Sequence, residues 1–192
     1  MERKTIKNIL NFLKEKEGKK LPYMWVRDLT QGELIQELET HPDGIQCRQN
    51  SLDLSDTDIT KLPNNLYIDG YLFLNNCNEL TELPSNLHVE VYLSLKGCEN
   101  ITELPNKLYV GSYLDLEYSG IKSLPEGLEV GGDLYLDSTS IKFLPKGLKV
   151  GGALVLGYSS YLLNFSDDEL FQMIDPNGNG EGYINGEIER SE

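Results

Sequence analysis

Three cysteines and two histidines are the side chains of this sequence best suited to nucleophilic, redox or metal chemistry. The cysteines are odd in number and include no Cys-x-x-Cys pair: Cys47, Cys77 and Cys98. We therefore expect no disulfide bridges, and we expect the protein to occupy a reducing, intracellular setting. His41 and His88 have no recognisable catalytic residues beside them. No P-loop, His-Glu-x-x-His motif or dinucleotide-binding glycine pattern occurs. We therefore predict that the protein is not an enzyme.

A set of oxygen-bearing side chains near the C-terminus could bind calcium: Asp175, Asn177, Asn179 and Glu181. Together with Gly180 this run resembles the loop of an EF-hand, in which oxygen ligands occupy positions one, three and five and glycine position six. The run departs from that motif where an apolar residue and a bidentate Glu are required, because Gly182 and Gly186 stand there. Calcium is therefore an alternative, and no cofactor is expected.

The residues after this loop support a different interpretation. Tyr183-Ile184 and Glu187-Ile188 lie on either side of Asn185-Gly186, which is a favoured two-residue hairpin turn. In that interpretation the segment is a small hairpin and has no metal ligands of its own.

Tyrosines recur at a fixed spacing in the middle of the chain, at Tyr71, Tyr92 and Tyr113. Tyrosine among polar neighbours is typical of binding hot spots. These rings and their neighbours form a candidate partner-binding surface of Tyr71, Phe73, Tyr92, Tyr113, Asp115, Tyr118, Asp133, Tyr135 and Asp137. The alternative is that the aromatic residues only stabilise a sheet through cross-strand pairing.

The tyrosine spacing belongs to a repeat: a Leu-x-Leu pair, a Leu-Pro-x-x-Leu segment, then Val or Ile and a turn. The first leucine of each pair recurs every 20 or 21 residues, at Leu52, Leu72, Leu93, Leu114, Leu134 and Leu154. The Leu-Pro leucines have the same spacing, at Leu62, Leu83, Leu104, Leu124 and Leu144. Because side chains alternate along a strand, each pair predicts a strand with buried leucines, and stacked repeats bury these in one column.

This repeat resembles the leucine-rich-repeat family over about residues 45–165. The Leu-Pro-x-x-Leu half is similar to the short repeats of bacterial effectors such as the IpaH class. The other half, as in Val130–Leu136, is similar to repeat proteins encoded by bacteriophages and bacteria. The resemblance implies an α+β fold, a leucine-rich-repeat solenoid with parallel strands on the concave face. It implies no particular function, because repeat scaffolds present many unrelated surfaces.

A small polar residue stands three positions after the second leucine of each pair: Thr57, Cys77, Cys98, Ser119, Thr139 and Ser159. Such groups can hydrogen-bond to the backbone inside a turn. We therefore interpret Cys77 and Cys98 as structural thiols that each point into their own turn. A redox or nucleophilic role is the alternative.

A solenoid needs covered ends, because its apolar core otherwise faces water. We predict a helical N-terminal cap over residues 1–44, with helices near 4–16 and 31–39. The solenoid takes residues 45–165, and a C-terminal helix with an acidic tail takes 166–192. That helix is expected over 167–174, starting at a capping box of Ser166 and Glu169. The basic N-terminal helix could alternatively dock on an acidic partner or a membrane surface.

The net charge of −14 limits the class of partner. An acidic body repels phosphate backbones, so nucleic acid is not expected and a basic protein surface is favoured. No stretch is apolar enough to span a bilayer, and a membrane is not expected among the partners. We predict a phage or bacterial protein, cytoplasmic in a bacterial host, that binds and sequesters or inhibits another protein through the concave face. A calcium-responsive module and a self-associating structural protein are the alternatives.

Overall fold

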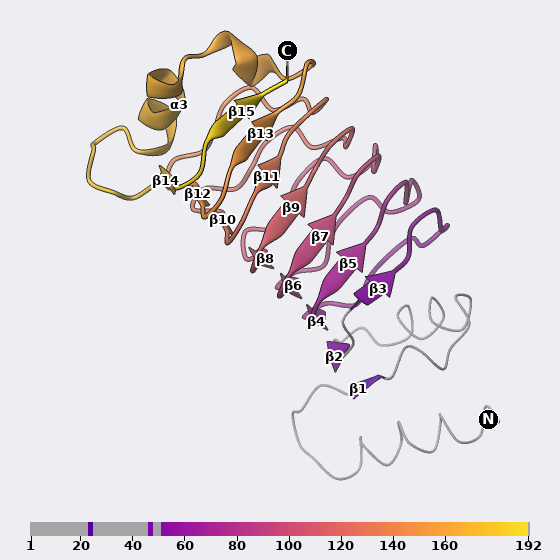
Figure 1. The fold of residues 1–192 in the computed structure, drawn as a ribbon. Coiled ribbons are helices and arrows are strands. Elements are labelled where there is room, and N and C mark those ends of the chain that lie inside the picture. Colours follow the sequence, from indigo (N-terminus) through magenta and orange to yellow (C-terminus); the bar gives the residue numbers. More distant parts are fainter. Residues whose placement is uncertain (1–22, 25–45, 48–50, 192) are drawn as a thin grey trace, which may run out of the picture.

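A computed structural model describes Tyr23–Met24, Gln46–Cys47 and residues 51–191, and the described coils stack into a parallel β-solenoid (Figure 1). Coils recur every 20 or 21 residues, and the strands of neighbouring coils pair in parallel to form two sheets. We name them sheet 1, whose first described strand is β3 (Ser51–Asp53), and sheet 2, whose first described strand is β1 (Tyr23–Met24). The helices predicted near 4–16 and 31–39 lie outside the described residues.

Sheet 1 contains the Leu-x-Leu pairs. Its described strands are β3 (Ser51–Asp53), β5 (Tyr71–Phe73), β7 (Tyr92–Ser94), β9 (Tyr113–Asp115), β11 (Leu134–Tyr135), β13 (Leu154–Leu156) and β15 (Ile188–Arg190). Neighbouring coils are in register, so that Leu114 pairs with Leu93 and Leu134. These leucines are fully buried, as the alternation of side chains along a strand requires. The strands predicted on the leucine pairs are confirmed.

Sheet 2 stands where the sequence predicts only a turn. Its described strands have two residues each: β1 (Tyr23–Met24), β2 (Gln46–Cys47), β4 (Tyr67–Ile68), β6 (His88–Val89), β8 (Tyr109–Val110), β10 (Glu129–Val130), β12 (Lys149–Val150) and β14 (Tyr183–Ile184). The Val or Ile of each strand from β4 to β14 is buried, whereas the residue before it reaches the surface. Two residues are too few for alternation to be recognised, so the second sheet was missed.

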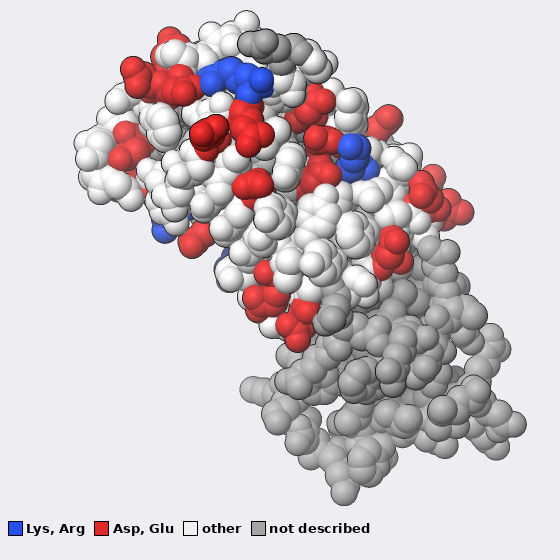
Figure 2. Space-filling model, in the orientation of Figure 1, with Lys and Arg blue, Asp and Glu red and all other residues white. Residues whose placement is uncertain are grey.

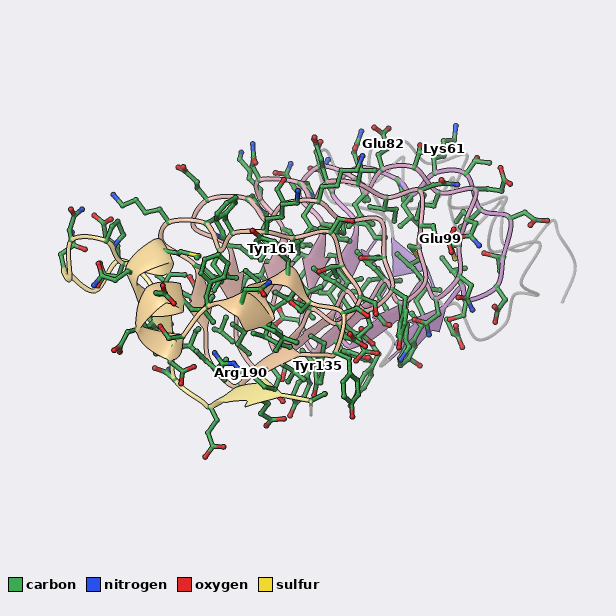
Figure 3. All side chains as sticks on the ribbon, turned by 90° about the horizontal axis from the view of Figure 1, so that it is seen from above. Lys61, Glu82, Glu99, Tyr135, Tyr161 and Arg190 are labelled. Carbon is green, nitrogen blue, oxygen red and sulfur yellow. The ribbon has the colours of Figure 1, made fainter. Side chains whose placement is uncertain are left out.

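The Leu-Pro segments close each coil on the remaining side. Their leucines are buried, and Glu103 and Ser123 form an isolated parallel bridge between neighbouring segments. Lys61 and Glu82, from two such segments, lie on the side opposite Tyr135 of sheet 1 (Figure 3). No helix occurs between residues 51 and 160, because a coil of this length leaves little chain for a return helix.

The C-terminal segment caps the stack with one further coil. A 3₁₀ helix, η2 (Tyr161–Asn164), leads to α3 (Asp167–Ile174), which covers the end of the solenoid (Figure 1). The predicted capping box is present: the Glu169 N–H donates to Ser166 Oγ, and the Ser166 N–H donates to the Glu169 carboxylate. The predicted C-terminal helix is confirmed.

The hairpin interpretation of residues 183–188 is wrong. β14 pairs in parallel with β12, and β15 pairs in parallel with β13, so the two strands belong to different sheets. Ile184 and Ile188 take the inward positions of Val150 and Leu154. Arg190 fastens this coil, because its guanidinium lies 2.6 Å from Asp167 Oδ1 and donates to the Phe165 carbonyl.

Candidate binding surface

The predicted tyrosine column exists on the outer face of sheet 1. Tyr71, Tyr92 and Tyr113 come from β5, β7 and β9 and are directly in register. Their ring centroids are 6.5 and 6.3 Å apart, with planes nearly perpendicular, so the rings meet edge to face rather than side by side. Tyr71 and Tyr113 are 40% and 42% exposed, whereas Tyr92 is half-buried. The two outer rings can therefore reach a partner.

Tyr92 is half-buried because it leans across the sheet. Its ring meets Phe73 edge to face, with centroids 5.4 Å apart, and its hydroxyl donates to the Asp115 carboxylate at 3.1 Å. Burial and the neighbouring Asp115 charge raise the pKa of Tyr92 to about 12. The ring therefore connects the column of tyrosines with the next column of outward side chains.

That next column contains a depression. Its residues in successive coils are Phe73, Ser94, Asp115 and Tyr135, so two short side chains stand between two large rings. Asp115, one of the candidate partner-binding residues, is only 8% exposed, because Tyr92 lies beside it.

An open cavity of about 430 Å³, which we call the groove, lies against Asp115 and Tyr135 of this column. Its lining residues are Tyr71, Tyr92, Lys96, Tyr113, Asp115, Glu117 and Tyr135. In Figure 2 the same face is largely uncharged over β5 and β7, and acidic side chains gather over β11 and β13. Of the predicted partner-binding residues, five therefore line one site: Tyr71, Tyr92, Tyr113, Asp115 and Tyr135.

Asp115 is the buried charge of the groove. Its Oδ1 accepts from the Glu117 N–H at 2.9 Å, and its Oδ2 accepts from Tyr92. The Ser94 hydroxyl is 3.4 Å from Oδ2 but lies closer to Asn75. Burial raises the pKa of Asp115, and these donors only partly oppose that effect. Within the described residues, no Lys or Arg forms an ion pair with it.

Lys96 is the cation at the rim of the groove. Its ammonium forms an ion pair with Glu117, and this hydrogen bond raises the pKa of Lys96. The same ammonium lies 5.6 Å from the centroid of the Tyr118 ring. One wall of the site thus already combines a cation, a carboxylate and an aromatic ring.

Tyr118 is held in an unusual backbone conformation. It has a φ of 55° and is 53% exposed. The equivalent residues of four other coils also have positive φ, and most are types that tolerate it: Asp56, Asn76, Gly97 and Ser138. An exposed tyrosine is a poor choice for this turn, and local packing does not account for it.

Asp133 and Asp137 of the candidate partner-binding surface form hydrogen bonds within the solenoid, and we predict that their charges also steer a basic partner. Asp133 accepts from the Ala153 N–H at 2.8 Å and from the Tyr135 hydroxyl at 3.3 Å. Asp137 accepts from the Ser138 hydroxyl at 3.2 Å. Their carboxylates remain part of the acidic border of the face, and steering stays a prediction.

A second aromatic stack was missed in the sequence. His88, on β6, lies between Tyr67 and Tyr109 of sheet 2, with centroids 4.6 and 4.2 Å away and nearly parallel planes. The Glu90 carboxylate accepts from the Tyr67 hydroxyl at 2.7 Å and lies 2.8 Å from His88 Nε2. These hydrogen bonds lower the pKa of Glu90. The sequence signal that could have predicted this stack is a ring at the same repeat position in three consecutive coils, Tyr67, His88 and Tyr109.

Cys77 and Cys98 are buried, unpaired thiols. Cys77 Sγ donates to the Leu54 carbonyl at 3.0 Å, and Cys98 Sγ donates to the Leu74 carbonyl at 2.8 Å. Both acceptors belong to the preceding coil, so the expectation that each sulfur points into its own turn is wrong. Burial raises the pKa of Cys98 to about 11 and also raises that of Cys77. Slow native labelling of both thiols remains a prediction.

The other ladder positions behave as expected, with one exception. Thr57, Ser119 and Thr139 each donate to the carbonyl of the second leucine in their own coil. Ser159 is exposed, and Ser160 is buried instead and caps η2. The helix that follows this coil shifts the turn by one residue.

The loop proposed for calcium is closed by its own hydrogen bonds. Both carboxylate oxygens of Asp175 accept backbone N–H groups, from Asn179 at 3.1 Å and Gly180 at 2.8 Å. Glu181 accepts from the Asn179 amide and forms an ion pair with Lys146 at 2.7 Å. Among the described residues, no group of three or more His, Cys, Asp and Glu is placed to hold a metal.

In comparisons with known proteins, the chain matches no family model, no curated protein and no solved structure. None of the helices in the described part of the chain is long and apolar enough to cross a membrane. A function can therefore be inferred only from the side chains of the surface itself.

Proposed function

We propose that this protein is a non-enzymatic binding module that takes a basic protein onto the outer face of sheet 1. The observation that carries the proposal is the groove, where exposed tyrosines surround a buried carboxylate. Tyrosine gives large contact area at a low entropic cost, and such residues dominate the affinity of interfaces. The acidic border over β11 and β13 favours encounter with a basic surface.

The finer identity of the module is part of the same proposal. The repeat spacing, buried leucine ladder and ladder thiols support membership of the leucine-rich-repeat class, with a bacterial or phage origin. In such a setting the module would sequester or inhibit its partner in the bacterial cytoplasm. Because the groove lies on the outer face of the solenoid, binding there would cover part of the partner's surface and block it.

Two tyrosines of one coil provide the test. Tyr109 and Tyr113 are both 42% exposed, but Tyr109 belongs to sheet 2 and Tyr113 to sheet 1. A partner recovered by affinity capture and identified by mass spectrometry is then titrated against Tyr113→Ala and Tyr109→Ala. We expect Tyr113→Ala to weaken binding by about 2 kcal/mol, as for a hot spot, and Tyr109→Ala to change it little. The reverse pattern would contradict the proposal.

Two alternatives are separated by simple measurements. Self-association through the solenoid would give a concentration-dependent mass in sedimentation equilibrium. A calcium-responsive module would release or absorb heat on titration with Ca²⁺, and this heat would disappear in Asp175→Asn. Neither alternative involves the groove.

A further inference from the structure

The groove contains the negative charge of Asp115, which forms no ion pair within the described residues. Asp115 is 8% exposed, and the groups that donate hydrogen bonds to it are neutral: the Glu117 N–H, the Tyr92 hydroxyl and, at 3.4 Å, the Ser94 hydroxyl. A carboxylate has about four lone-pair sites, so acceptor capacity remains on the side of the cavity. A buried charge without an ionic partner is costly, and a cation from outside would relieve that cost.

The walls of the groove suit one kind of cation. Tyr113 stands on one side of Asp115 in the same strand, β9, and Tyr135 is its direct neighbour on β11. A cation beside tyrosine faces is attracted by their π-electrons. The planar guanidinium stacks on such rings, is weakly hydrated and presents several donors to a carboxylate, whereas ammonium does not combine these properties.

The chain itself contains the same combination at the rim. Lys96 pairs with Glu117 and lies over the Tyr118 ring, so one carboxylate and one ring are already occupied by an internal cation. Asp115, Tyr113 and Tyr135 are the corresponding groups without one. The cavity of about 430 Å³ is ample for the end of a single arginine side chain.

We propose that the groove receives an arginine side chain of the partner, with its guanidinium on the Asp115 carboxylate between Tyr113 and Tyr135. This inference rests on the proposed function and names the residue that anchors the partner. The guanidinium supplies the missing positive charge, and the rings exclude water from the pair. Lysine fits less well because its ammonium is strongly hydrated.

A titration that needs no natural partner tests the inference. The probe is the peptide acetyl-Gly-Gly-Arg-Gly-Gly-amide, and the matched control carries citrulline, which keeps the shape but has no charge. Binding is followed by the NMR shifts of the tyrosine ring signals. We expect the arginine peptide to bind at least about tenfold more tightly than the citrulline peptide. Equal affinities, or no shifts with either peptide, would overturn the inference.

Two variants keep the test independent of folding. Asp115→Asn should reduce the affinity for the arginine peptide by about tenfold. Lys96→Met removes the competing cation at the rim and should tighten binding by about fivefold, which a damaged fold cannot do. An arginine affinity unchanged in both variants would overturn the inference. If the natural partner still depends on Tyr113 in that case, the proposed function stands and only the arginine anchor fails.

Discussion

At the scale of single residues, Asp115 is a buried carboxylate inside the candidate binding site. Its carboxylate is buried beside Tyr92, accepts hydrogen bonds from neutral donors and forms no ion pair within the described residues. Such a group lowers stability when ionised, because burial favours the neutral acid. Binding sites tolerate this cost where the charge is needed for a ligand.

The pH dependence of stability follows from that burial. Because the folded-state pKa of Asp115 is raised above its ordinary value of 3.8, its stabilising contribution is complete below that value. The contribution is then lost as pH rises through the folded-state pKa. Asp115→Asn removes this loss, so the unfolding free energy of the variant minus that of the wild type should increase from pH 3.5 to pH 7. Urea unfolding at several pH values measures it, and a decreasing difference would refute the explanation.

Tyr118 gives a second prediction at this scale. A left-handed backbone costs a tyrosine about 1 kcal/mol, whereas asparagine adopts it readily. Tyr118→Asn should therefore leave the unfolding free energy unchanged or raise it by about 1 kcal/mol. Tyr158→Asn is the matched control, since Tyr158 holds the same position of a later coil without a positive φ. A loss of stability in Tyr118→Asn, measured by urea unfolding, would show that the ring has a structural role.

At the scale of elements, the leucine ladder of sheet 1 determines stability. Leu114 is fully buried in the middle of the stack and contacts the coils on both sides. Leu114→Ala should lower the unfolding free energy by about 2–5 kcal/mol, because the neighbouring coils hold the cavity open. Lys122→Ala, at an exposed position eight residues later, should change it little. A small effect of Leu114→Ala in urea unfolding would contradict the central position of this coil.

The elements also show which parts of the fold could be predicted. The leucine spacing specifies sheet 1 because each leucine repeats at the same position in every coil. Sheet 2 could not be recognised from two-residue strands with a single buried side chain. The last coil was missed because α3 separates β15 from β13, and because isoleucine replaces valine at Ile184 and leucine at Ile188.

The candidate site was predicted only in part, for a reason that lies in side-chain packing. The column of Tyr71, Tyr92 and Tyr113 follows directly from the register of the repeats. The groove depends on how far Tyr92 leans toward Asp115, which spacing does not determine. A column with Ser94 and Asp115 between two large rings was the signal available in the sequence.

At the scale of the whole molecule, the solenoid presents different chemistry on its different sides. Sheet 1 has exposed rings and an acidic border, whereas the Leu-Pro side has scattered charges such as Lys61 and Glu82 (Figures 2 and 3). With a net charge of −14, we expect association with a basic partner to be accelerated at low salt and slowed at high salt. The outer face of sheet 1 is therefore the side on which a partner should be found.

Site-specific photocrosslinking tests this location most directly. Benzoylphenylalanine replaces either Tyr71, on sheet 1, or Phe143, a 64% exposed residue on the Leu-Pro side, and each protein is irradiated with its partner. We predict a crosslinked complex from position 71 and none from position 143. A complex formed from position 143 alone would place the partner on the opposite side of the solenoid and contradict the account.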